Sequence, residues 1–380
     1  MDFSLTHEQE DFVAAIRDFC SRECGTPEQR ERLTNGYTEA HSAEIYSKMA
    51  DLGWLGVTID EDHGGSGGGM LDACLFMEET SRGLAPINGY ATTLIVAGAV
   101  QRFGNDEQRR EILGGIASGS VEAIAMTEPE AGSDVGSLTT SAARVNGGFV
   151  INGQKVFCSN AHISDHVLVV CRTGKGETKH EGLSMIFVPT DNPQMEITPI
   201  DTLGGRETSY LYFTDCEAPA DAVLGEVDQA WMQLMAGLNV ERLILAATML
   251  GLGRRAFDDA LAYVKERRQF GRPIGSFQAL QHRLADLATE LEAARLMTYW
   301  VASAVDSALD KMLPREASMV KLKVTETAQR AALEGMQMMG GYGYSSEYDM
   351  ERLVRQTLVS TIYGGTSEIQ RNIIAKSYGL

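Results

Sequence analysis

The chain has 380 residues, 44% of them hydrophobic, and carries 52 acidic against 33 basic side chains. This length exceeds one ordinary domain and this hydrophobic content can fill a large core, so we expect two or three packed domains. A net charge of −19 disfavours nonspecific binding to nucleic acid or to an anionic membrane. We therefore expect no nucleic-acid partner.

The cysteines and the first residues of the chain bear on its compartment. Six cysteines are scattered without the spacing of a disulfide framework or a zinc site. The chain starts with a polar, acidic segment, and we find no run of about 18 apolar residues, the length that a membrane span needs. We therefore predict no metal, no membrane insertion and a cytoplasmic location.

The first 120 residues carry helical patterns. Thr6 suits a helix N-cap, and apolar positions from Phe12 to Phe19 recur at three- and four-residue steps. The same period runs from Ile45 to Leu55, and a further helix passes through Leu75. The glycine-rich run 64–69 between them has no preceding strand and no Gly-Lys-Ser/Thr, so we expect a connector and not a phosphate loop.

After Gly119 the pattern changes to short β-rich runs separated by Asn-Gly, Gly-Lys-Gly and Pro turns. These runs lie at 149–151, 167–170, 183–188 and 210–213. Near Ala230 the helical period returns, and a stripe over 280–301 predicts a long bundle helix with partners at 243–262 and 317–339.

We predict an α+β multidomain fold with an N-terminal helical domain (1–120), a middle β-barrel-like domain (121–228) and a C-terminal four-helix-like bundle (229–380).

The segment 362–371 reads Ile-Tyr-Gly-Gly-Thr-Ser-Glu-Ile-Gln-Arg and leads into a final helix ending at Leu380. Its glycines allow close approach of a ligand, although a turn that caps a terminal helix explains the same residues. This sequence resembles the C-terminal signature of the acyl-CoA dehydrogenases, which remove two hydrogens across the α and β carbons of an acyl thioester. The family usually has its catalytic glutamate between the Tyr and the Gly, and this chain has Gly364 there. The resemblance places Thr366 and Glu368 at the cofactor.

Residues 126–134, Met-Thr-Glu-Pro-Glu-Ala-Gly-Ser-Asp, resemble the flavin loop of that family, with Glu130 in place of the usual Gly. The same residues also describe an ordinary turn. The resemblance implies that Met126 and Thr127 bind the flavin of FAD and that Ser133 lies near both cofactor and thioester. It also implies that Phe157 covers a flavin face and that Ser159 bonds the flavin, in a segment that reads Phe-Cys-Ser-Asn where the family has Trp-Ile-Thr-Asn.

The basic segment 267–274, Arg-Arg-Gln-Phe-Gly-Arg-Pro-Ile, suits diphosphate, although charges that cap a helix C-terminus are a competing explanation. The resemblance implies that five residues reach the FAD of a neighbouring subunit: Arg267, Phe270, Gln278, Gln337 and Gly341. A homotetramer built as a dimer of dimers is then expected.

The missing base has a candidate at Glu241, in an Asn-Val-Glu-Arg-Leu stretch at the start of the C-terminal bundle. A carboxylate favoured by the helix dipole is the structural explanation. The Glu-Arg pair resembles the isovaleryl-CoA and long-chain branch, whose base stands at this position, and Glu368 is the alternative base. The resemblance gives substrate contacts to Ser133, Arg242, Tyr363, Gly364 and Gly365, the last two as backbone donors to the thioester carbonyl.

The resulting prediction is FAD-dependent α,β-dehydrogenation of an acyl-CoA to the trans-2-enoyl-CoA, in fatty acid β-oxidation, with an electron-transfer flavoprotein as acceptor. The alternatives are an enoyl-CoA reductase of the same fold, such as the crotonobetainyl-CoA type, and a flavin monooxygenase on this scaffold.

Overall fold

The computed structural model describes residues 4–307 and 313–380. The chain divides into two compact units. The first, here called the helical unit, holds the described residues of 1–32, 69–85 and 241–380. The second, the sheet unit, holds residues 33–68 and 86–240. The helices α1 and α4 thus group with the C-terminal bundle, although they lie far from it in the sequence.

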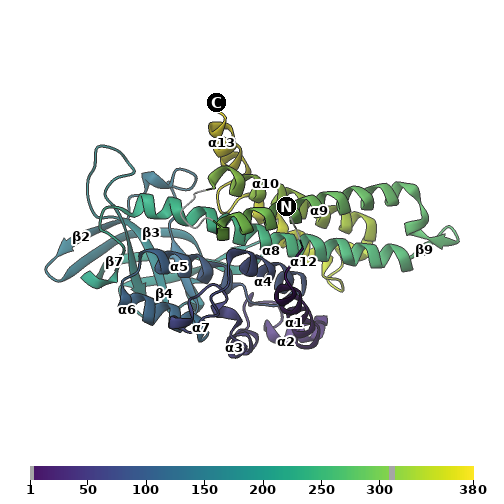
Figure 1. Ribbon diagram of the computed structural model, residues 1–380, viewed down its shortest axis with the longest axis horizontal. Helices are drawn as coiled ribbons and strands as arrows, with labels where there is room; N and C mark the ends of the chain where they lie inside the picture. Colours follow the sequence, from purple (N-terminus) through teal and green to yellow (C-terminus); the bar gives the residue numbers. More distant parts are fainter. Residues whose placement is uncertain (1–3, 308–312) are drawn as a thin grey trace. The chain divides into compact units, whose positions relative to one another are not determined.

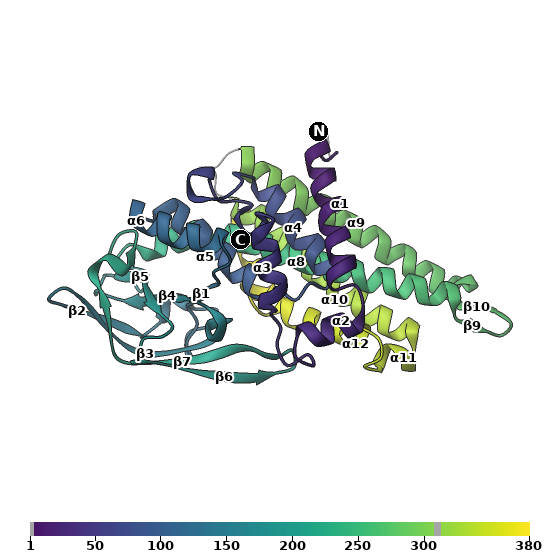
Figure 2. The same cartoon turned by 90° about the horizontal axis from the view of Figure 1, so that it is seen from below.

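The helical unit is built around long helices that pack along their lengths (Figure 1). The period-based predictions at 243–262, 280–301 and 317–339 fall inside α8, α9 and α10 and are confirmed. Its elements are α1 (His7–Glu23), α2 (Pro27–Leu33), α4 (Met70–Arg82), α8 (Ala230–Glu266), β9 (Arg268–Gln269), β10 (Arg272–Pro273), α9 (Gln278–Ser307), α10 (Pro314–Met339), α11 (Gly341–Tyr344), α12 (Met350–Leu358) and α13 (Ser367–Ser377). Of α8, the part from residue 241 onward belongs to this unit, and residues 230–240 belong to the sheet unit. In Figures 1 and 2 the β9–β10 hairpin joins the far ends of α8 and α9.

The start of α1 follows from its sequence. The Thr6 hydroxyl accepts from the backbone N–H of Gln9, and the Gln9 side chain accepts from the backbone N–H of Thr6. This capping box satisfies two donors that have no partner within the helix, and it confirms Thr6 as the N-cap. The buried face of α1, with Ile16 and Phe19, carries the predicted apolar stripe.

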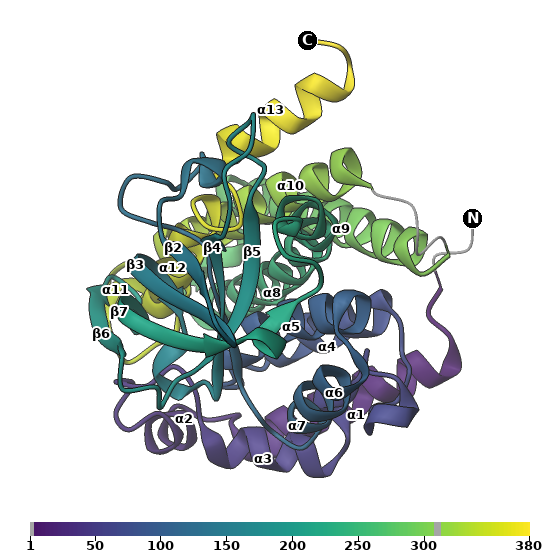
Figure 3. The ribbon, with the colours of Figure 1, turned by 90° about the vertical axis from the view of Figure 1, so that its left-hand side faces the viewer.

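The sheet unit holds one eight-stranded sheet, seen in Figure 3 with β3 and β7 side by side. The strand order is β6-β7-β3-β2-β4-β5-β8, and β1 pairs in parallel with β4. The strands are β1 (Glu122–Ala125), β2 (Ser141–Val145), β3 (Gly148–Ser159), β4 (His166–Arg172), β5 (Leu183–Pro189), β6 (Met195–Thr202), β7 (Gly205–Pro219) and β8 (Val223–Leu224). Its helices are α3 (Ala43–Asp51), α5 (Gly89–Phe103), α6 (Asp106–Gln108) and α7 (Gly114–Ala117), with a π-helical turn at Arg109–Leu113.

Strand β4 shows why its sequence is a continuous apolar run. Val167 and Val169 lie in one hydrophobic core with other strands, whereas Leu168 and Val170 lie in a second core with Val96 of α5. Because successive strand residues point to opposite faces, a strand buried on both faces cannot alternate between apolar and polar residues.

Three sequence expectations need correction. The helix expected from Ile45 to Leu55 ends at Asp51, because Gly53 adopts a left-handed φ of 74° and Leu55 lies in a separate 3-10 turn. The last helix ends at Ser377 and not at Leu380. Strands β1, β2 and β6 also form, although the sequence analysis found no runs there.

Helix α8 has no unbroken run of 18 apolar residues, because Glu241 and Arg242 interrupt it, but it is long and apolar enough on average to meet a criterion for crossing a membrane. Among the described residues it is the helix that meets this criterion, with a window of mean hydropathy 1.3. Within the protein, 69% of that window is buried. The buried core helix of a bundle has the same length and composition.

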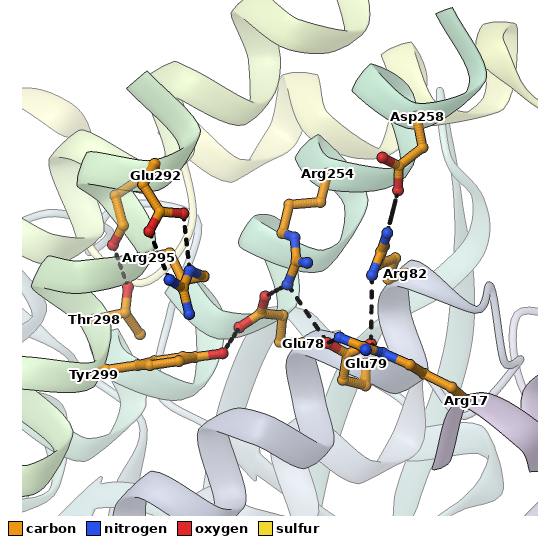
Figure 4. A network of polar contacts seen from close by, with 11 residues as sticks. Arg17, Glu78, Glu79, Arg82, Arg254, Asp258, Glu292, Arg295, Thr298 and Tyr299 are labelled. Carbon is orange, nitrogen blue, oxygen red and sulfur yellow. Dashed lines mark hydrogen bonds and ion pairs between the residues drawn. The ribbon is translucent and has the colours of Figure 1, made fainter. Parts of the chain in front are cut away.

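A buried ionic network joins α1, α4, α8 and α9 inside the helical unit (Figure 4). Glu78 and Glu79 of α4 are almost completely buried. Arg254 of α8 pairs with Glu78, whose other oxygen accepts from the Tyr299 hydroxyl at 2.7 Å. Arg17 of α1 pairs with Glu79 at 2.6 Å. These contacts join the N-terminal helices to the bundle.

Candidate active site

The turn between α12 and α13 contains Gly364 and Gly365, with φ angles of 59° and 83°. Side-chain-bearing residues rarely adopt these angles, so the two glycines are required by the local backbone. The Thr366 hydroxyl then accepts from the N–H of Ile369 and caps α13, as expected from the sequence.

Glu241 of α8 lies beside this turn. A Cβ atom added to Gly364 would be 3.8 Å from a carboxylate oxygen of Glu241 and 2.5 Å from a terminal methyl carbon of Leu245. The Glu241 carboxylate therefore reaches the immediate surroundings of the position where the family usually carries its base. Leu245, one helical turn further along α8, fills the space that a side chain at position 364 would need.

The environment of Glu241 makes it a stronger base than an exposed carboxylate. Glu241 is 9% exposed, and burial raises the pKa of its carboxyl group, while the nearby cations Arg242 and Lys321 partly oppose this increase. Arg242 is also buried, and burial lowers its pKa against the attraction of Glu241.

Glu368, the alternative base, has the opposite environment. It is exposed on the first turn of α13, and hydrogen bonds to its own backbone and to Thr366 lower its pKa. A lowered pKa makes Glu368 a weaker base than Glu241.

Two residues that the sequence analysis did not select hold the turn. Buried Lys321 of α10 donates to the carbonyl oxygens of Ser360 and Gly365, at 2.8 and 2.9 Å. The Gln370 amide donates to the carbonyl oxygens of Gly364 and Gly365, at 3.0 and 2.9 Å. A lysine within the largely apolar pattern of a predicted core helix was the available sequence signal for Lys321.

Close by in the helical unit, a pocket of about 560 Å³ brings the predicted cofactor residues Thr366 and Glu368 together. It is lined by Glu326, Gln329, Thr361, Ile362, Thr366, Ser367, Glu368 and Arg371. The Ser367 hydroxyl oxygen is buried without a hydrogen-bond partner among the described residues. A buried hydroxyl without a partner is consistent with a polar group supplied by a ligand.

In the sheet unit, the predicted flavin loop is fixed by a buried ion pair. Lys155 of β3 donates to the Glu128 carboxylate at 2.8 Å and to the carbonyl oxygen of Met126 at 3.0 Å. Glu128 also accepts from the backbone N–H groups of Thr139 and Thr140. Burial alone would raise the pKa of Glu128, but Lys155 and these hydrogen bonds lower it to about 2.

Glu130, which stands where the family usually has a glycine, does not disturb this loop. Glu128 and Ala131 exchange backbone hydrogen bonds of 3.1 Å across the turn. Glu130 is exposed, and its φ is not in the left-handed range, so the turn does not require a glycine there. Ser133, further along the loop, is also exposed.

Strand β3 changes partners at the predicted flavin segment. The pairing of β3 with β7 shifts register between Lys155 and Cys158, and the Val156 N–H instead donates to the Thr127 carbonyl oxygen at 2.9 Å. Phe157 has a φ of 55° and is 61% exposed. The bulge thus turns an aromatic ring out of the sheet, next to the loop that carries Thr127 and two residues before Ser159.

A second pocket of the helical unit, about 610 Å³, contains Arg267 and Gly341 of the predicted cofactor residues. The Arg267 guanidinium lies 5.8 Å from the Tyr342 ring centre. Added Cβ atoms on Gly340 and Gly341 would meet no atom within 4 Å, so the backbone there is open to a ligand.

Three predicted cofactor residues do not line this pocket. Phe270 lies in the β9–β10 hairpin with a φ of 52° and is 93% exposed, Gln278 begins α9, and Gln337 lies in the last turn of α10.

Among residues 4–307 and 313–380, no group of three His, Cys, Asp or Glu side chains could hold a metal ion. The six cysteines are free and buried.

The chain matches three family descriptions in sequence. They are "Acyl-CoA dehydrogenase, N-terminal domain" over residues 6–120, "middle domain" over 123–216 and "C-terminal domain" over 228–379. The chain belongs to the acyl-CoA dehydrogenase family. The three family segments and the observed helices and sheet also confirm the predicted fold class.

Several individual acyl-CoA dehydrogenase relatives match nearly the full length. An acyl-CoA dehydrogenase of Bacillus subtilis is 35% identical over 98% of both chains. The mitochondrial isovaleryl-CoA dehydrogenase of Solanum tuberosum is 34% identical over 97% of this chain and 90% of its own. The caffeyl-CoA reductase-Etf complex subunit CarC of Acetobacterium woodii is 34% identical over 94% and 95%.

Solved structures agree with these matches. The acyl-CoA dehydrogenase of Geobacillus kaustophilus superposes with a TM-score of 0.93 at 32% identity over the whole of both chains. The FAD complex of PigA superposes with a TM-score of 0.92 at 28% identity, also over both whole chains.

Acyl-CoA dehydrogenases are FAD-dependent oxidoreductases, and FAD is the cofactor of this chain. The residues present fit this cofactor. Phe157 and Phe270 expose aromatic rings, the Ser367 hydroxyl has no partner in the described protein, and Gly340 and Gly341 leave open space beside Arg267.

Proposed function

We propose that this enzyme removes the α-proton and the β-hydrogen of an acyl-CoA thioester, giving the trans-2-enoyl-CoA, with Glu241 as the base. The observation that carries the proposal is the combination at one place of a buried Glu241 and a Gly364 that has no side chain. The position that usually carries the family's base has no side chain here, and the carboxylate of Glu241 on α8 lies next to it.

The α-proton of a thioester is a weak acid, so its removal needs a base that water does not solvate strongly. Burial of Glu241 supplies that condition, because it raises the pKa of the carboxyl group. Arg242, at the next position on α8, keeps a positive charge beside the carboxylate. In this proposal Arg242 and Tyr363 contact the substrate.

The developing negative charge on the thioester oxygen needs hydrogen-bond donors. The carbonyl oxygens of Gly364 and Gly365 already accept from Gln370, whereas their N–H groups have no acceptor among the described residues. We assign these N–H groups to the thioester oxygen. FAD, when bound, supplies the hydride acceptor for the β-hydrogen.

The remaining predicted cofactor residues also have roles in this proposal. Met126, Thr127, Ser133, Phe157 and Ser159 bind the flavin end of FAD.

Thr366 and Glu368 bind FAD from the turn before α13. Arg267, Phe270, Gln278, Gln337 and Gly341 reach the FAD of a neighbouring subunit in a homotetramer. An electron-transfer flavoprotein is the proposed electron acceptor, in line with the Etf complex named for CarC.

One finding favours the reverse reaction, the reduction of an enoyl-CoA. The relative CarC is named as a reductase subunit, and this chain is 34% identical to it. An enoyl-CoA reductase would use the same site to add hydrogen, and direction then depends on the flavin potential and on the electron-transfer partner.

The test is anaerobic mixing of the purified FAD-loaded protein with saturated acyl-CoAs of short, branched and long chains, followed by loss of oxidised flavin absorbance. Bleaching by one class is expected, and it would establish the dehydrogenase and its substrate class together. Absence of bleaching by every ester, with reoxidation of the reduced enzyme by enoyl-CoA, would establish the reductase and overturn the dehydrogenase.

A further inference from the structure

Lys321 is a buried cation with two backbone partners in one turn. Its side chain is 0% exposed, and its ammonium donates to the carbonyl oxygens of Ser360 and Gly365, at 2.8 and 2.9 Å. Both acceptors lie in the turn that contains Gly364. Taking a lysine ammonium out of water is costly, so a buried lysine that holds one turn calls for an explanation beyond packing.

In this turn, carbonyl oxygens have hydrogen-bond partners within the described protein, whereas the N–H groups of the two glycines do not. Lys321 and Gln370 together occupy the carbonyl oxygens of Ser360, Gly364 and Gly365. Within residues 4–307 and 313–380, the N–H groups of Gly364 and Gly365 have no acceptor. Each carbonyl oxygen shares a peptide plane with the N–H of the next residue. Gln370 therefore holds the plane that carries the Gly365 N–H, and Lys321 holds the adjoining plane between Gly365 and Thr366 and a second point of the turn at Ser360.

The charge of Lys321 also acts on Glu241. Burial lowers the pKa of Lys321 to about 8, and Glu241 opposes this decrease. In turn, Lys321 reduces the rise in pKa that burial imposes on Glu241. The other charged groups that act on Lys321 are Arg242 of α8, Glu326 of α10 and Glu368 of α13. Glu241 is the buried carboxylate of this group.

We propose that Lys321 is a positioning residue of the reaction, which anchors the turn that carries the Gly364 and Gly365 donors and places a positive charge near the carboxylate of Glu241. This inference rests on the proposed function, because it takes Glu241 as the base. A buried cation at this place opposes the rise in the pKa of Glu241 and so favours the ionised carboxylate that can accept the α-proton.

The test compares Lys321→Met with Lys323→Met. Lys323 lies two residues further along α10 and pairs with Glu290 on a partly exposed surface, so it controls for loss of a lysine from the same helix. The measurement is the rate of anaerobic flavin bleaching at saturating acyl-CoA, between pH 6 and 9, together with FAD content. Lys321→Met is expected to bleach at least tenfold more slowly and to shift the acidic midpoint of the rate upward by about one pH unit. Lys323→Met is expected to leave both unchanged.

Lys321→Gln keeps an N–H donor without the charge. It is expected to show the same upward shift with a smaller loss of rate, and it carries the test if Lys321→Met does not retain FAD. The proposal is overturned if the midpoint of the Lys321 variants equals that of Lys323→Met, even when their thermal stability is lower, because a purely structural lysine gives that result. Wild-type bleaching by Glu241→Gln would instead refute Glu241 as the base, whatever the Lys321 variants do.

Discussion

Burial decides which carboxylate near the Gly364 turn can act as a base. Burial raises the pKa of Glu241, whereas hydrogen bonds at the exposed start of α13 lower the pKa of Glu368. A proton acceptor in the ordinary carboxylate range is a poor match for the α-proton of a thioester. Residue type alone does not separate the two glutamates, but their surroundings do.

Glu241→Gln is expected to keep FAD and acyl-CoA bound while flavin bleaching falls by about 10²–10⁴-fold, the usual contribution of a general base. The glutamine has nearly the same shape but cannot accept the α-proton. Stopped-flow absorbance would measure the rate, and Glu368→Gln, compared at equal FAD content, tests the alternative base. Normal bleaching by Glu241→Gln and loss of bleaching in Glu368→Gln would move the base to Glu368.

Gly364→Ala is expected to destabilise the protein. The positive φ costs about 1–2 kcal/mol for a side-chain-bearing residue, and the new Cβ must also displace Leu245. Gly98→Ala is the control, since Gly98 lies inside α5 with open space around it and alanine there is expected to stabilise by roughly 0.5–1 kcal/mol. Urea unfolding would measure both changes.

In the background of Leu245→Ala, the cost of Gly364→Ala is expected to decrease, because the clash is removed and only the backbone strain remains. An unchanged cost in that background would show that Leu245 is not what excludes a side chain from position 364.

At the scale of elements, strand β3 and the loop after β1 form one assembly. The strand leaves β7 at a bulge, pairs through Val156 with Thr127, and inserts Lys155 beneath the loop onto Glu128. This arrangement exposes Phe157 while the backbone on either side stays bonded. The geometry of the predicted flavin contacts therefore depends on a buried ion pair that makes none of those contacts itself.

The Glu128 carboxylate predicts a dependence of stability on acid. Its pKa in the folded protein, about 2, lies below the ordinary value of 4.5, so its stabilisation is complete above pH 4.5 and is lost as the pH falls toward 2. The full effect is about 3 kcal/mol, from about 1.4 kcal/mol per pKa unit.

Glu128→Gln is expected to lower the free energy of unfolding at pH 7 and to flatten its decrease between pH 5 and 3, measured in urea. Exposed Glu130→Gln should change neither. The same acid slope in wild type and Glu128→Gln would contradict the assignment.

The buried ionic network that joins α4 and α8 gives a second prediction at the scale of helices and strands. Arg254→Met leaves Glu78 buried without its main cation, which typically costs about 3–5 kcal/mol. Arg22→Met removes the exposed pair with Asp18 on α1 and is expected to cost less than about 1 kcal/mol. Thermal unfolding would separate the two, and equal small losses would mean that Tyr299 alone satisfies Glu78.

For the whole molecule, the proposal places residues of two subunits at each FAD. Glu241→Gln and Arg267→Met are each expected to be inactive, the first without its base and the second without its diphosphate contact. When the two variants are coexpressed and mixed oligomers are isolated with two tags, activity is expected to return, because some sites combine intact residues from both chains.

Coexpression of Glu241→Gln with Glu241→Ala is the control and should stay inactive. If the mixed oligomers with Arg267→Met also stay inactive, each site takes Glu241 and Arg267 from one subunit, or the enzyme does not assemble as proposed.

The sequence by itself determined the long elements. Regular three- and four-residue apolar steps identified α1, α9 and α10, and continuous apolar runs identified β4 and β5. Burial of one face produces a periodic apolar pattern, and burial of both faces produces a continuous one. The motif at 362–371 located the turn of Gly364, and the absence of a side chain there directed attention to Glu241. Strands β1, β2 and β6 have weaker apolar patterns, and they were not predicted.

Only the tertiary structure decided what surrounds Glu241. Lys321 lies 80 positions away on another helix, Gln370 lies on α13, and Leu245 limits position 364 from α8. Their roles depend on distances between separate helices, which no local pattern encodes. The same holds for Lys155 and Glu128, whose pairing becomes visible only when strand and loop lie together. Residue types can indicate that a base is present, but its strength is set by burial and by charges that folding brings near.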